Sequence, residues 1–245
     1  LTGSSFSVDW QCVREAITER TRLIIINTPH NPTGSVWEED DIQQLRELVS
    51  DTNIYLIGDE VYEHMVFDQR VHRSLCRYED LYTRSFVISS FGKTYHVTGW
   101  KVGYCVAPEQ LTLEFRRIHQ YVTFTVNTPV QYGLADFLQA QPEHHLQLPD
   151  FYEAKRDLFC SLLASSKFKI KPSSGTYFQL LDYSEVTDEL DHVLAERWTK
   201  ELGVASIPIS VFYQDPENCK HKALRFCFAK DDTTLRQAAE ILCKL

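Results

Sequence analysis

Lys93 stands just beyond a short apolar run, where a lysine could carry out covalent chemistry. The run over residues 85–89 is short and bounded, which predicts a buried strand. Ser90 follows this run directly, and a second cation, Lys101, lies further along. A lysine at the end of a strand can form a Schiff base with a carbonyl cofactor, whose phosphate a hydroxyl and another cation can bind. Taken alone, a lysine in this place is more often a solvated loop residue.

Two upstream segments also place polar side chains directly after apolar runs. Leu23–Ile26 precedes the block NTPHNPTG, and Ile54–Gly58 precedes the block DEVYEH. Ligands of open α/β sheets bind beyond the carboxyl ends of the strands. Because Asn31, Asp59 and Lys93 each follow such an end, we expect three strands to point at one place.

Five blocks of this sequence resemble those of class I, fold-type I aminotransferases, which depend on pyridoxal 5′-phosphate (PLP). The blocks are NTPHNPTG, DEVYEH, SSFGKTYHVTGWKVGY, GTYF and LRFCFAK. They occur in the order of the family, and five blocks in register are far more specific than any single one. The resemblance is nearest to the kynurenine and methionine (glutamine) aminotransferase subgroup. It implies that an amino group moves between an amino acid and a 2-oxo acid through a PLP aldimine on Lys93.

The resemblance assigns roles to the residues that would face the cofactor ring. Lys93 would hold PLP and, once substrate displaces it, would act as the base that moves a proton. Asp59 would pair with the pyridinium nitrogen, while the Tyr62 hydroxyl and the Asn31 amide would donate to the phenolate oxygen. The structural alternatives are a helix N-cap for Asp59, a core aromatic for Tyr62 and a turn residue for Asn31.

The phosphate and the substrate carboxylate would have their own ligands. Ser90 and Lys101 would bind the phosphate, where many relatives carry arginine in place of Lys101. Arg225 lies inside an apolar run, and a buried cation needs a partner. The resemblance implies a bidentate clasp of Arg225 on the substrate α-carboxylate, with Asn31 nearby. The alternative for Arg225 is a structural ion pair with a core carboxylate.

The same resemblance suggests methionine, an aromatic amino acid, glutamine or kynurenine as the amino donor. A carbon–sulfur β-lyase acting on cysteine S-conjugates would use the same lysine and aspartate, so it remains an alternative. A catalytically incomplete fragment is a further alternative. Compared with the family, Leu1 falls well inside the large domain, so we expect the amino-terminal third, with its phosphate-binding turn and stacking aromatic ring, to be missing from this sequence.

Composition narrows the classes of partner. A formal net charge of −9 argues against nucleic acid bound through a broad basic face. Seven cysteines, without close paired spacing, fit a reducing compartment, and we expect a cytoplasmic location. No apolar run reaches the length of a membrane span, and no histidine shows the spacing of a zinc ligand, so we expect neither membrane nor metal binding. The family resemblance implies a homodimer.

Alternating strand-like and helix-like patterns predict an α/β fold of PLP-dependent transferase fold type I, with a mostly parallel sheet in the large domain. We place the carboxyl-terminal part of that PLP-binding domain at residues 1–145 and a smaller α/β domain at 146–245. In the first, strands are expected at 22–27, 54–58, 86–89 and 102–107, and helices at 8–19, 38–49, 111–122 and 130–139. In the second, strands are expected at 175–181 and 223–229, and helices at 150–163, 188–202 and 233–245.

Overall fold

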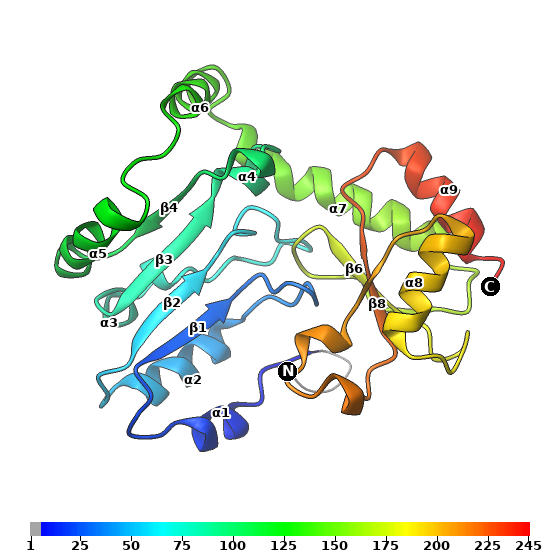
Figure 1. Ribbon diagram of the computed structural model, residues 1–245, viewed down its shortest axis with the longest axis horizontal. Coiled ribbons are helices and arrows are strands. Elements are labelled where there is room, and N and C mark those ends of the chain that lie inside the picture. The colour runs from blue at the N-terminus through cyan, green and yellow to red at the C-terminus, as the bar shows by residue number, and fades with distance from the viewer. Residues whose placement is uncertain (1–5) are drawn as a thin grey trace. The chain divides into compact units, whose positions relative to one another are not determined.

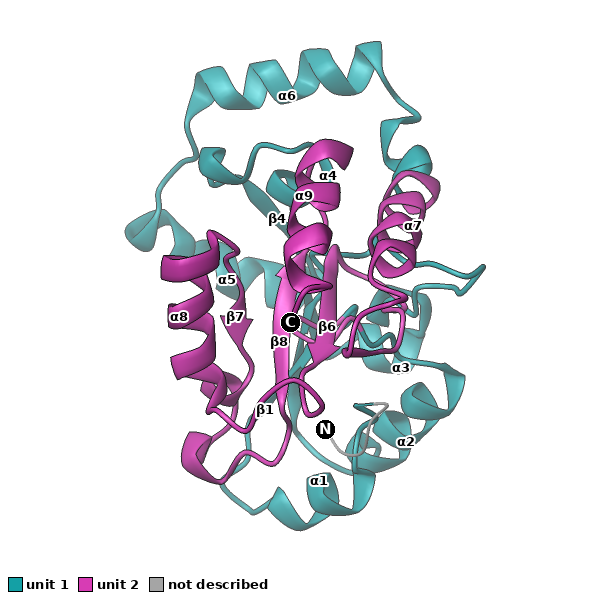
Figure 2. Cartoon of the chain, turned by 90° about the vertical axis from the view of Figure 1, so that its right-hand side faces the viewer, with its two compact units in different colours: residues 1–29, 35–148 teal, residues 30–34, 149–245 magenta. Residues whose placement is uncertain are grey.

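The computed structural model describes residues 6–245 and is shown in Figure 1. The chain forms two compact units, which are coloured separately in Figure 2. The first contains the residues up to 29 together with 35–148, and the second contains 30–34 together with 149–245. The short segment 30–34 therefore belongs to the second unit, although it lies between two strands of the first in sequence.

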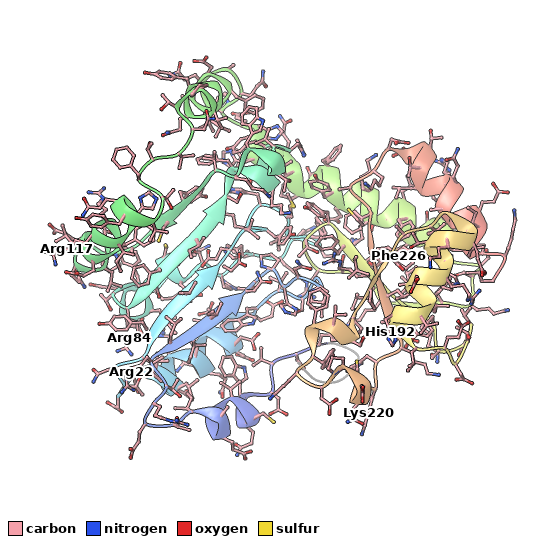
Figure 3. All side chains as sticks on the ribbon, in the orientation of Figure 1. Arg22, Arg84, Arg117, His192, Lys220 and Phe226 are labelled. Atoms are coloured by element: carbon pink, nitrogen blue, oxygen red, sulfur yellow. The ribbon has the colours of Figure 1, made fainter. Side chains whose placement is uncertain are left out.

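The first unit is built on a four-stranded sheet with the order β1-β2-β3-β4. Its strands are β1 (Leu23–Asn27), β2 (Tyr55–Asp59), β3 (Ser85–Ser90) and β4 (Gly103–Val106). The first three strands pair in parallel, and β4 pairs antiparallel with β3. This arrangement confirms the predicted α/β class with a mostly parallel sheet. The carboxyl ends of β1, β2 and β3 consequently meet at one edge, opposite the edge marked by Arg22 and Arg84 in Figure 3.

Helices precede, connect and follow these strands. They are α1 (Trp10–Ala16), α2 (Glu39–Val49), α3 (Glu79–Tyr82), α4 (Phe91–Thr94), α5 (Glu109–Val122) and α6 (Thr128–Ala140), and α7 (His144–Leu162) continues into the second unit. Short 3₁₀ turns cover Leu75–Arg77 and Thr98–Trp100. Asp9 is the N-cap of α1, whereas Glu38 is the N-cap of α2 and exchanges a capping-box contact with Asp41.

The core of the first unit lies between α2 and the sheet. The buried stripe of α2 consists of Ile42, Leu45 and Val49, as its spacing predicts. These side chains belong to one apolar cluster with the strand residues Ile26 and Leu56. Removing this stripe from water stabilises the sheet. The same sheet positions the polar residues that follow the carboxyl ends of its parallel strands.

Two helical predictions need correction. The first helix ends at Ala16 and not at Glu19, because the residue after it, Ile17, adopts extended backbone geometry. The helix expected to begin at Asp150 begins at His144, and Pro149 lies inside it. The helix expected at 111–122 is confirmed as α5, and none of its described residues is buried.

The second unit contains an antiparallel sheet with the order β5-β6-β8-β7. The strands are β5 (Lys169–Ile170), β6 (Phe178–Asp182), β7 (Ile207–Pro208) and β8 (Ala223–Cys227), and the helices are α8 (Asp191–Leu202) and α9 (Asp232–Leu242). The ring of Phe159 on α7 packs 6.3 Å from that of Phe226 on β8, and Phe168 packs 5.9 Å from Trp198 of α8. The two short strands β5 and β7 were not predicted, since two residues carry no periodic signal.

Within the described residues, no helix combines the length and apolar character needed to cross a membrane.

Candidate active site

Asp59 is the last residue of the central parallel strand β2, at the carboxyl edge of the first sheet. Its backbone carbonyl accepts hydrogen bonds from the Asn27 amide at 3.0 Å and from the Thr28 N–H at 3.2 Å. Its side-chain Oδ1 accepts a weaker bond from the Val61 N–H at 3.4 Å. Burial is the largest cause of a raised pKa for Asp59, and the neighbouring Glu60 adds to it. The carboxylate thus holds a proton or a cationic N–H more strongly than an exposed aspartate.

Lys93 acts electrostatically on this carboxylate and also lies near Tyr62. Lys93 is the third residue of α4, which follows β3 directly, and its Nζ is 5.9 Å from the centroid of the Tyr62 ring. Tyr62 is buried, with 3% of its surface exposed. The charge of Lys93 lowers the pKa of Asp59 and so opposes the effect of burial. An amine, a carboxylate and a phenol are therefore gathered in the first unit, as the sequence predicted.

Ser90 shapes the turn that presents Lys93. Its Oγ accepts a hydrogen bond from the Gly92 N–H at 3.0 Å and donates to the Val102 carbonyl at 3.2 Å. A Cβ atom at Gly92 would lie 3.0 Å from the Cα of Thr98, so this close turn favours glycine. Lys101 is exposed and has left-handed backbone geometry, with φ of 56°, where the 3₁₀ turn ends.

Asn31 and Arg225 come together in the second unit. The Arg225 guanidinium, on β8, donates to the Asn31 Oδ1 although 194 residues separate them in sequence. The guanidinium carbon also lies 4.0 Å from the centroid of the Phe178 ring and 5.8 Å from that of Phe212. Aromatic faces and an amide oxygen therefore hold the cation in place.

The loop that carries Asn31 is fixed by close backbone contact. Gly34 has φ of +70°, and a Cβ atom there would lie 2.5 Å from the Cβ of Ser173 and 2.9 Å from the carbonyl oxygen of Gly175. The Gly34 carbonyl accepts a hydrogen bond from the Ser174 N–H at 3.1 Å. Glycine is required here by both its conformation and the lack of space. This contact explains why segment 30–34 belongs to the second unit.

Sequence reasoning missed three hydrogen bonds around the Lys93 turn. The Glu63 carboxylate accepts hydrogen bonds from the Ser89 hydroxyl at 2.6 Å and from the Tyr104 hydroxyl at 2.7 Å. The His144 Nε2 donates to the Thr94 carbonyl at 2.9 Å. Each contact joins residues from different parts of the chain, so no local spacing could reveal it.

The chemistry of these donors fits PLP. The first unit offers an amine for the aldehyde, a carboxylate for a protonated ring nitrogen, a phenol for the phenolate, and the hydroxyl and ammonium of Ser90 and Lys101 for phosphate. The second offers Asn31 and the guanidinium of Arg225. Each set is assembled within its own unit. Among the residues that the structure describes, no group of three or more His, Cys, Asp or Glu side chains could hold a metal ion.

The sequence and fold are similar to those of known proteins. A methionine aminotransferase of Escherichia coli is 52% identical over 98% of this chain and 62% of its own length. A kynurenine–oxoglutarate transaminase of Dictyostelium discoideum is 35% identical over 98% of this chain and 61% of its own. The crystal structure of an E. coli protein identified as a methionine aminotransferase superposes with a TM-score of 0.95 at 51% identity, and it covers all of this chain and 64% of the other.

The chain thus spans about 62% of the length of the E. coli relative. The family described as aminotransferase class I and II matches residues 2–242, which include every polar residue of the candidate site. This protein therefore belongs to the aminotransferase class I and II family.

Proposed function

We propose that the protein is a PLP-dependent aminotransferase that moves an amino group between an amino acid and a 2-oxo acid. The observation that carries this proposal is the position of the Lys93 ammonium, 5.9 Å from the Tyr62 ring and close enough to Asp59 to lower its pKa. Family membership supports the cofactor, because this family is PLP-dependent. The names of the two relatives support methionine and kynurenine as amino donors. Aromatic amino acids and glutamine are further candidates that the resemblance of the sequence blocks implies.

PLP, when bound, would supply a conjugated ring that withdraws electrons from the substrate Cα. The Lys93 Nζ would hold the cofactor aldehyde and then carry the proton that leaves Cα. The Asp59 carboxylate would keep the ring nitrogen protonated, for which its burial and raised pKa suit it. The Tyr62 hydroxyl and the Asn31 amide would donate to the phenolate oxygen, since both are hydrogen-bond donors.

The anionic groups would be bound by the remaining residues. Ser90 and Lys101 would hold the phosphate, for which Lys101 supplies a point charge. Arg225 would bind the substrate α-carboxylate through two parallel hydrogen bonds. Its contacts with Phe178 and Asn31 support this role, because they orient the fork and reduce the conformational entropy lost on binding.

We also propose that the protein works as two domains, 1–145 and 146–245, and as a homodimer. The homodimer is supported by exposed apolar side chains on and just after α5. Ile118 is 65% exposed, Tyr121 86% and Phe124 80%, and an apolar surface of this kind is typical of a protein–protein contact. A second copy of this face is expected to bury them. Sedimentation equilibrium of the wild type and of Ile118→Glu checks this, since only the wild type should dimerise. A wild type that stays monomeric would rule out the homodimer.

The activity is tested by incubating the protein with PLP, L-methionine and a 2-oxo acid, and by identifying the products. Transamination yields the 2-oxo acid of methionine and a new amino acid. A cysteine S-conjugate is offered in parallel, because β-elimination would give pyruvate and a thiol. Amino-group transfer that Lys93→Ala abolishes supports the proposal, whereas elimination without transfer would contradict it.

A further inference from the structure

Glu60 is a buried carboxylate directly beside Asp59. Only 1% of its surface is exposed. Its Oε1 accepts a hydrogen bond from the Leu75 N–H at 3.0 Å, and its Oε2 lies 2.7 Å from the His72 Nε2. Its own backbone N–H donates to the Ile88 carbonyl at 2.9 Å. Burying a carboxylate is costly, so its place next to a site residue requires an explanation.

Two donors from one segment hold the Glu60 carboxylate. They are the Leu75 N–H and the His72 ring, whose Nε2 lies 2.7 Å from the Glu60 Oε2. The other ring nitrogen of His72, Nδ1, is buried and has no hydrogen-bond partner among the described residues. Glu60 is therefore the hydrogen-bonding partner that the structure gives the His72 ring.

Glu60 directly follows Asp59 and begins the turn that carries Tyr62. The Glu63 N–H donates to the Glu60 carbonyl at 2.8 Å, which closes the turn 60–63. A Cβ atom at Gly58 would lie 3.1 Å from the Glu60 Oε1, so the preceding strand makes room for the carboxylate. The charged groups acting on Asp59 are Glu60, which raises its pKa, and Lys93, which lowers it.

We propose that Glu60, held by His72, is the positioning residue of Asp59: its buried carboxylate anchors the backbone directly after Asp59 to the segment that carries His72 and Leu75, and its negative charge strengthens Asp59 as a hydrogen-bond acceptor for a cationic N–H. With PLP as cofactor, that N–H is the protonated ring nitrogen, so this part rests on the proposed function. The effect is electrostatic, because two neighbouring carboxylates oppose each other's ionisation. Glu60 itself touches neither substrate nor cofactor in this assignment.

Three substitutions separate charge from packing. Glu60→Gln keeps the shape and the acceptor for the Leu75 N–H but removes the charge. His72→Gln keeps an N–H donor for Glu60, so the charge stays. Glu63→Gln is the matched control, because it removes a carboxylate from the same turn that is not among the charges acting on Asp59. Thermal unfolding of each variant establishes that it is folded.

Two measurements are made on each protein. The first is a ¹³C NMR titration of the Asp59 carboxyl in the cofactor-free protein, assigned with Asp59→Asn. The second is the ¹⁵N chemical shift of the ring nitrogen of ¹⁵N-labelled PLP bound to the protein. We expect Glu60→Gln to lower the proton affinity of Asp59 by about tenfold and to move the ring nitrogen towards its unprotonated shift. His72→Gln and Glu63→Gln should leave both signals close to those of the wild type.

The proposal is overturned if folded Glu60→Gln shows the wild-type Asp59 titration, or if Glu63→Gln changes it as much. If Glu60→Gln does not fold, Glu60→Ala replaces it, because it removes the same negative charge and should lower the proton affinity of Asp59 in the same direction. The carboxyl titration needs no cofactor. A protein that fails to bind PLP but shows the expected titration would therefore reject the proposed function and keep the electrostatic role of Glu60.

Discussion

The Nζ of Lys93 lies 5.9 Å from the centroid of the Tyr62 ring, and its charge lowers the pKa of the nearby Asp59. Lys93 follows β3, whereas Asp59 ends β2, so neighbouring parallel strands bring these groups together. Their proximity follows from the topology, because parallel strands end at the same edge of a sheet. The proposed function depends on this pair of residues, Lys93 and Asp59.

Replacing Asp59 with asparagine is expected to slow amino-group transfer without preventing cofactor binding. The amide keeps the acceptor for the Val61 N–H but has no charge for a protonated ring nitrogen. We expect kcat to fall by about 10²–10³-fold, as when one preorganised electrostatic partner is removed. Steady-state kinetics with methionine checks this. Asp51→Asn, at an exposed position in the same unit, should leave kcat unchanged. Equal rates for Asp59→Asn and wild type would exclude the assigned role.

Replacing Arg225 with lysine is expected to weaken substrate binding. Lysine keeps the charge but loses both the planar fork and the stacking on Phe178. We expect kcat/KM to fall by about 10–100-fold, mainly through a higher KM, which matches the loss of one hydrogen bond to a charged group. Arg197→Lys is the control in the same unit, because Arg197 pairs with Glu189 at the surface. An unchanged KM in Arg225→Lys would show that the carboxylate is bound elsewhere.

Gly34 and Gly203 form a matched pair for a test of stability. Both have φ of +70°, but only Gly34 has neighbours within reach of a new Cβ atom. Gly203→Ala should lower the free energy of unfolding by about 1 kcal/mol, from backbone strain alone. Gly34→Ala should lower it by about 2–4 kcal/mol, because the methyl group also collides with Ser173. Urea unfolding compares the two, and equal losses would contradict the close packing of the loop.

His30 predicts a pH dependence of stability. It lies in the Asn31 loop, its Nδ1 is 2.8 Å from the Thr33 Oγ1, and burial lowers its pKa from 6.5 to about 4. Between these values the unfolded chain binds more protons than the folded one, so stability falls as the pH falls from 6.5 towards 4. We expect His30 to reduce the free energy of unfolding by about 1–2 kcal/mol between pH 7 and pH 5.

The comparison of variants isolates this contribution from that of other groups. His30→Asn should flatten the difference in urea midpoint between pH 7 and pH 5. His192→Asn should not, because the His192 side chain is 60% exposed on α8, where Figure 3 labels it. Identical pH profiles for His30→Asn and wild type would contradict the prediction.

Much of the first unit could be predicted from sequence because its signals are local. The buried strands around Leu56 and Val87 are short apolar runs, and the stripe of α2 has clear helical spacing. The residues that follow these strands were identified because the edge of a parallel sheet is set by strand direction alone. The roles assigned to them depended on resemblance, and they remain predictions.

Other features could not be predicted because they depend on distant parts of the chain. The contact between Asn31 and Arg225 spans 194 residues. The Glu60–His72 pair has no recognisable spacing, and its role depends on burial. The start of α7 is a further case, because proline usually ends a helix, yet this helix runs from His144 to Leu162 with Pro149 inside it.

The most direct test of the account is the site at which PLP becomes attached. PLP is added to the wild type, to Lys93→Ala and to Lys230→Ala, which alters an exposed lysine. Visible spectra are recorded before and after borohydride reduction, and the modified peptide is identified by mass spectrometry. The account predicts a visible band for the wild type and Lys230→Ala, fixed by reduction on Lys93, and its loss in Lys93→Ala. A folded wild type without the band, or equal labelling of Lys93→Ala at other lysines, would contradict it.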